Sequence, residues 1–161
     1  MKKLIYTLLI IIAFTNNSFS AGTSSDSSDS SSSYTKAKNL IKAAKKYEKK
    51  GKTEKALKRY TKAQKLLLTS NEKKPLQADT LNYLGFTTRK LGDYEKGEEF
   101  YLQGLQIEPN HKGINEYLGE LYIVTGRIDM AKERLQVLKT CNCEEYAELK
   151  GIIEGTKKSK Y

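Results

Sequence analysis

The chain has 161 residues, a formal net charge of +10, two cysteines, one histidine and no tryptophan. This length allows one domain with a continuous core. A single histidine excludes a site built from several histidines, and no glycine-rich phosphate loop occurs, so we predict neither an enzyme nor a bound cofactor or metal.

The first 20 residues have the pattern of a cleaved secretory signal peptide. Lys2 and Lys3 precede an apolar run from Leu4 to Phe14, and Ser18 to Ala21 offer small residues for cleavage. An uncleaved membrane anchor is the alternative, but the run is shorter than the roughly 20 residues that span a bilayer. We expect a periplasmic or secreted protein with no transmembrane segment in the mature chain.

Residues 21–34 form a serine-rich segment, with eight serines between Gly22 and Ser33. Because this segment has almost no apolar surface to bury, we predict a disordered linker. A helical domain is expected over residues 35–155, followed by a basic tail at residues 156–161.

The stretch from Ala78 to His111 predicts two amphipathic helices joined by a tight turn. Apolar and small residues recur at three- and four-residue spacing in both halves. Gly92 is expected to end the first helix in a left-handed conformation, and Asp93 to cap the second. The second helix should stop before Pro109.

Marked residues of this stretch lie at fixed offsets: Leu84-Gly85, Leu91-Gly92-Asp93-Tyr94, Tyr101, Leu105 and Pro109. In this pattern the stretch resembles the tetratricopeptide repeat, a helix-turn-helix unit of 34 residues. The spacings Gly85 to Gly119 and Gly92 to Gly126 are also 34 residues, which places a further repeat at residues 112–145.

A first repeat at residues 37–70 resembles the same family in Gly51, Ala56, Tyr60 and Ala63. A last helix near residues 143–155 should cover the open apolar end of the stack. The resemblance therefore implies an all-α superhelix, a tetratricopeptide-repeat solenoid of three helix-turn-helix repeats with a C-terminal capping helix.

The pair Cys141 and Cys143, two residues apart, leaves three interpretations open. They can form a local disulfide at the turn into the capping helix, act as a reactive or intermolecular thiol pair, or hold a soft metal such as copper(I). The one histidine, His111, lies at a turn between repeats, where a capping or solvated role is expected.

The family geometry places the first helix of each repeat on a concave face, which predicts a partner-binding groove. Its side chains would be basic at one end and acidic at the other, with an aromatic centre at Phe86. The predicted groove residues are Lys38, Lys45, Lys49, Asn82, Phe86, Arg89, Lys90, Glu116 and Glu120.

We therefore predict a non-catalytic module that binds a protein or peptide partner, and we expect no nucleic acid. One alternative function is binding of an anionic polymer or membrane surface through the lysine-rich first repeat. Another is a thiol or copper-handling role at Cys141 and Cys143.

Overall fold

The computed structural model describes residues 26–159, so the predicted signal peptide and residues 21–25 lie outside the described residues. This part of the chain consists of seven α-helices joined by short turns. They are α1 (Asp26–Glu48), α2 (Thr53–Lys73), α3 (Ala78–Lys90), α4 (Tyr94–Ile107), α5 (Lys112–Val124), α6 (Ile128–Leu138) and α7 (Glu144–Ile153). None of the described helices is long and apolar enough to cross a membrane.

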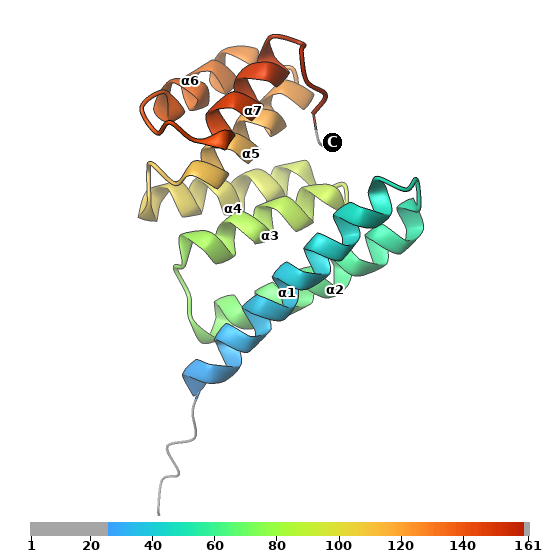
Figure 1. The fold of residues 1–161 in the computed structure, drawn as a ribbon. Coiled ribbons are helices and arrows are strands. Elements are labelled where there is room, and N and C mark those ends of the chain that lie inside the picture. The colour runs from blue at the N-terminus through green and yellow to red at the C-terminus, as the bar shows by residue number, and fades with distance from the viewer. Residues whose placement is uncertain (1–25, 160–161) are drawn as a thin grey trace, which may run out of the picture.

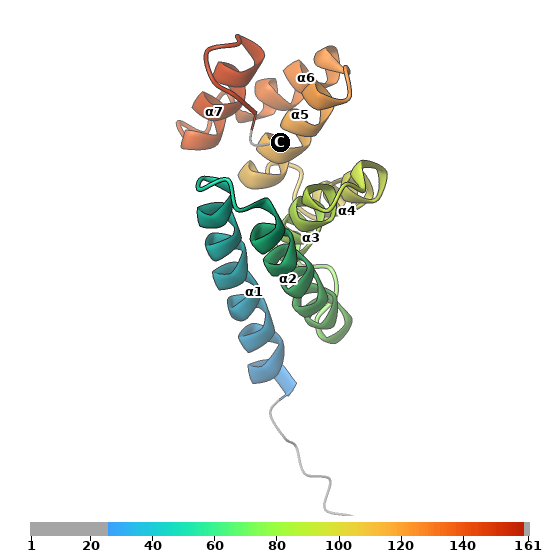
Figure 2. The same cartoon turned by 90° about the vertical axis from the view of Figure 1, so that its right-hand side faces the viewer.

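The helices stack as consecutive pairs, α1 with α2, α3 with α4 and α5 with α6, and α7 packs on the last pair (Figure 1). In the view turned by 90°, the first helix of each pair lies to the left of the second helix of the same pair, and α7 lies to the left of α5 (Figure 2). The all-α solenoid with a capping helix is confirmed.

The first helix begins earlier than the sequence predicted. Helix α1 starts at Asp26, so residues 26–34 of the predicted disordered linker form its N-terminal turns. Extending an existing helix by one residue costs far less than nucleating a new one, and Ser33 is buried against the domain. The predicted start of the helical domain at residue 35 is therefore too late, because the first helix extends into the serine-rich segment.

The turn at the centre of the chain has the predicted chemistry. Gly92 adopts a φ of 99°, which is accessible to glycine at no steric cost. The carboxylate of Asp93 accepts a hydrogen bond from the Lys96 backbone N–H at 2.9 Å, which satisfies one free donor of the first turn of α4. Both capping predictions are confirmed.

Helix pairs approach closely where a glycine faces a large side chain. A Cβ added at Gly85 would lie 2.5 Å from the ring of Tyr101, and one added at Gly119 would lie 2.5 Å from Leu149. Tyr101 and Leu149 are fully buried. The first contact holds α4 on α3 and the second holds α7 on α5, so small residues set the tightness of the stack.

Two glycines of α4 give a stability test. At Gly97 a Cβ would lie 3.1 Å from the carbonyl oxygen of Gly85, which is backbone and cannot rotate away. At Gly104 it would meet the tip of Ile114, a flexible side chain. We expect Gly97→Ala to lower the unfolding free energy by about 1 to 2 kcal/mol, because overpacking exceeds the gain in helix propensity.

For Gly104→Ala we expect a change of less than about 1 kcal/mol, since Ile114 can repack. Thermal and urea unfolding of the two variants measure the difference. A Gly97→Ala protein that is more stable than the parent would contradict a tight α3–α4 approach.

Candidate partner-binding site

The predicted groove residues lie at different depths on the inner side of the stack. Lys38 on α1 and Lys49 in the turn after α1 are exposed, and Lys45 and Lys90 are half-buried. The remaining five are buried: Asn82, Phe86, Arg89, Glu116 and Glu120. The prediction that these five line an open groove therefore needs correction: Phe86, Arg89 and Glu120 are interior residues, whereas Asn82 and Glu116 belong to the lining of a pocket.

Phe86 is the clearest case, because only 1% of it is exposed. Its ring centroid lies 5.7 Å from that of Tyr60 and 5.1 Å from that of Tyr117. Lys45 places its ammonium 4.5 Å from the Phe86 centroid and donates a hydrogen bond to the Tyr117 hydroxyl at 3.2 Å. Side chains of α1 and α5 thus meet over Phe86 and fill the centre of the predicted groove.

Arg89 is buried in the same interior and is 2% exposed. It donates a hydrogen bond to the backbone carbonyl of Tyr117 at 2.9 Å, and its guanidinium lies 3.7 Å from the carboxylate of Glu120, whose side chain is also fully buried. Burial lowers the pKa of Arg89, while Tyr101 and Glu120 favour its charged form. Arg89 joins α3 to α5 and is not available to a partner.

Lys90 connects the first two repeats. Its ammonium lies 2.6 Å from the carboxylate of Glu48, at the end of α1. The hydroxyl of Tyr60, from α2, donates to the same carboxylate at 2.8 Å. One carboxylate therefore connects α1, α2 and α3.

The open part of the inner side is a pocket between α3 and α5 that continues toward α7. Its first hollow has a volume of about 400 Å³ and its second about 220 Å³, and both are lined by Glu116, Tyr117 and Glu145. We call this continuous surface the acidic pocket. Its other acidic residues are Asp79, Glu108, Glu144 and Glu148.

Asn82 lines the first hollow and is 6% exposed. Its carboxamide oxygen is buried and meets no hydrogen-bond donor among the described residues. A Cβ added at Gly113, at the start of α5, would lie 2.7 Å from the Asn82 amide nitrogen. Glycine at that position therefore leaves room for the carboxamide in the pocket.

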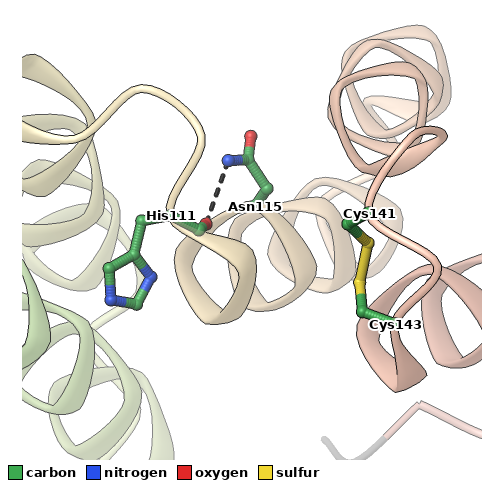
Figure 3. Close-up of a disulfide and its surroundings, with 4 residues drawn as sticks. All are labelled: His111, Asn115, Cys141 and Cys143. Carbon is green, nitrogen blue, oxygen red and sulfur yellow. Dashed lines mark hydrogen bonds between the residues drawn. A yellow bond between two sulfur atoms is a disulfide. The ribbon is translucent and has the colours of Figure 1, made fainter.

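His111 forms part of the wall of the same hollow. Its Nδ1 accepts a hydrogen bond from the Ile114 backbone N–H at 3.1 Å, which caps α5, and its Nε2 lies 3.3 Å from the Asp79 carboxylate. Asn115 donates to the His111 carbonyl at 3.0 Å and fixes the turn (Figure 3). The predicted capping role of His111 is confirmed.

Cys141 and Cys143 are joined by a disulfide at the turn between α6 and α7, with their Cα atoms 5.2 Å apart (Figure 3). Of the three interpretations, the structure has the local bridge. No three His, Cys, Asp or Glu side chains gather in a metal-binding arrangement within the described part of the chain.

The C-terminal tail reaches the edge of the acidic pocket, which the sequence did not predict. The chain turns back at Gly155, and the ammonium of Lys157 lies 2.6 Å from the Glu148 carboxylate. Ser159 then donates a hydrogen bond to Glu120 at 3.3 Å. A lysine of the chain itself thus pairs with one carboxylate of the pocket lining.

Comparison with known proteins gives a family match for the middle helix pair, α3 with α4. Residues 78–111 match the family described as tetratricopeptide repeat. No curated protein matches the chain. A similar solved structure is the first TPR of Spaghetti (RPAP3) bound to the HSP90 peptide SRMEEVD, with 19% identity, 76% of this chain and 94% of that chain covered, and a TM-score of 0.49. Residues 78–111 are thus a tetratricopeptide repeat, and the helix pairs on either side of it have the same helix-turn-helix arrangement.

The burial of Arg89 predicts a structural role that can be measured. Arg89→Met removes the cation beside a fully buried carboxylate, so we expect a loss of about 3 to 5 kcal/mol of unfolding free energy. Adding Glu120→Gln, which removes the buried charge, should recover part of that loss.

Urea unfolding of the parent, both single variants and the double variant gives the coupling energy between the two residues. Additive effects of the two substitutions would contradict the buried ion pair.

Proposed function

We propose that the chain is a non-catalytic protein-binding module whose acidic pocket holds a lysine- or arginine-bearing segment of a partner protein. The observation that carries this proposal is Asn82, a residue of the carboxylate-lined pocket whose carboxamide oxygen is a buried acceptor without a donor. A buried acceptor without a donor costs about 1 to 3 kcal/mol, and a donor from a ligand would remove that cost.

The charge of the pocket indicates the kind of partner. Glu144 and Glu145, in the first turn of α7, add negative charge to a wall that already holds Glu116. The contact between Lys157 and Glu148 also favours a cationic partner, since an ammonium group already binds this carboxylate of the pocket lining. Cationic side chains with N–H donors would match both the carboxylates and the acceptor of Asn82.

This proposal differs from a groove running along the whole inner side. Lys45 and Tyr117 meet across its centre, so a ligand is confined to the end formed by α3, α5 and α7. Phe86 then has a packing role. The proposed ligand is a cationic segment, in contrast to the peptide of mixed charge that the predicted groove would bind.

The proposal includes an exported compartment as the site of action. The pattern of Met1 to Ala21 supports export, and the disulfide between Cys141 and Cys143 suits an oxidising environment. Cell fractionation with a C-terminal epitope tag measures the location, and a wholly cytoplasmic signal would contradict it.

Asn82→Leu should separate binding from folding. We expect the affinity for a lysine-rich peptide to fall by about tenfold, a loss of about 1.4 kcal/mol, because the acceptor is removed. The unfolding free energy should stay unchanged or rise by about 1 kcal/mol, because an unpartnered buried oxygen is removed as well. Fluorescence anisotropy and urea unfolding provide the two measurements.

The matched control is Asn71→Leu. The oxygen of Asn71, on α2 and outside the pocket, is also buried without a donor in the described structure. Asn71→Leu should change the unfolding free energy in the same direction as Asn82→Leu and leave the affinity for the lysine-rich peptide unchanged. Equal peptide binding by Asn82→Leu and the parent would refute the role of Asn82.

Reversing the charge of the pocket should reverse its preference. Glu144→Lys with Glu145→Lys should weaken binding of a lysine-rich peptide by tenfold or more at low salt, while a glutamate-rich peptide gains affinity. The control, Glu133→Lys with Glu154→Lys, alters two exposed glutamates outside the pocket by the same total charge. A parent protein that prefers the glutamate-rich peptide would contradict the proposed partner.

A further inference from the structure

Charge is divided unevenly between the first helix pair and the rest of the stack. Residues 34–74 contain 15 lysines and arginines against three acidic residues, a net charge of +12. Residues 75–159 contain 11 lysines and arginines against 14 acidic residues, a net charge of −3. The excess positive charge of the described domain therefore comes from α1, α2 and the turns beside them.

Part of this charge forms a stripe on α2. Five exposed residues make up what we call the basic face: Lys55, Lys58, Arg59, Lys62 and Lys65. They follow one another at intervals of one and three residues, on the side of the helix away from the buried positions Ala56, Tyr60, Ala63 and Leu67.

Four residues of the basic face also line a hollow of about 370 Å³ together with Tyr47 of α1. The acidic residue within reach is Glu54, which lies 2.7 Å from Lys58. Both side chains of that pair are more than two-thirds exposed, so water and salt screen their attraction. The basic face keeps a net positive charge.

Two exposed leucines lie beside the basic face. Leu57 is 39% exposed and Leu68 is 41% exposed, next to Lys58 and one helical turn from Lys65. Cationic and apolar side chains together on an exposed helix are characteristic of helices that lie at a lipid–water interface. A single-stranded nucleic acid would instead need exposed aromatic rings for base stacking. Tyr47 is half-buried, and Arg59 lies 5.9 Å from its ring centroid.

We propose that the basic face of α2 binds the surface of a membrane rich in anionic phospholipids. The lysines and Arg59 contact headgroup phosphates, and Leu57 and Leu68 enter the interface. Helices α2 and α7 lie at opposite ends of the stack (Figure 1), and no residue of α2 lines the acidic pocket, so the two surfaces can be occupied together. This interaction is independent of the proposed peptide binding.

The test uses the full chain with sedimentation of phosphatidylcholine vesicles and of vesicles with equal phosphatidylcholine and phosphatidylglycerol. The readout is the increase in binding caused by the anionic lipid. The N-terminal segment is the same in every variant, so differences in this increase come from the substitutions. Lys58→Glu with Lys62→Glu and Lys65→Glu should reduce that increase by on the order of a hundredfold at low salt. The neutral variant with glutamine at these positions should be intermediate.

The matched control is Lys96→Glu with Lys132→Glu and Lys139→Glu. These lysines are exposed outside the first helix pair, and the change in net charge is the same. The control should keep at least half of the anion-dependent binding. All variants are first compared by thermal unfolding and by lysine-rich peptide binding, which the basic-face variants should retain.

Three results would overturn the proposal. One is equal loss of vesicle binding in the basic-face variant and the control, which would reflect net charge alone. Another is unchanged vesicle binding in the basic-face variant. The third is tighter binding of short duplex DNA than of anionic vesicles through the same lysines, which would make the ligand a nucleic acid.

Discussion

The close approach of neighbouring helices at small residues is the constraint on which the rest of the structure depends. Gly85 leaves space for Tyr101, and Gly119 leaves space for Leu149. A larger side chain at either position would separate the helices, because interiors are packed as densely as organic crystals. The tight stack brings α5 close enough to α1 for Lys45 to reach Tyr117, and that contact closes the centre of the inner side.

The sequence predicted the fold well because its signals are local. The 34-residue spacing from Gly85 to Gly119 and the caps at Asp93 and His111 each depend on a few neighbouring residues. The predicted groove failed at its centre for the opposite reason. The resemblance to the repeat family implied that Phe86 faces the inner side, but the side chains that cover it come from residues 41 positions before and 31 positions after it. The radius of the superhelix decides whether these distant side chains meet over Phe86, and the sequence of one repeat does not determine that radius.

The acidic pocket illustrates the same limit. Asn82 was correctly placed on the inner side, yet its isolation from hydrogen-bond donors depends on what α5 brings opposite to it. Gly113 provides the space, and its closeness to Asn82 follows from the α3–α5 contact. A sequence signal did exist in the two consecutive acidic residues that open α7, Glu144 and Glu145. Their meaning required knowing that α7 lies beside α5.

The division of charge links the two proposed interactions. At physiological ionic strength the Debye length is about 8 Å, so the positive first helix pair acts on ligands near it and has little effect on the far end of the stack. A cationic segment would be repelled by α1 and α2 and attracted to the pocket at α5 and α7, which favours one orientation of approach. Anionic headgroups bound to the basic face would neutralise the repelling end. Attachment to a membrane would then leave the acidic pocket as the dominant electrostatic feature that a basic partner meets.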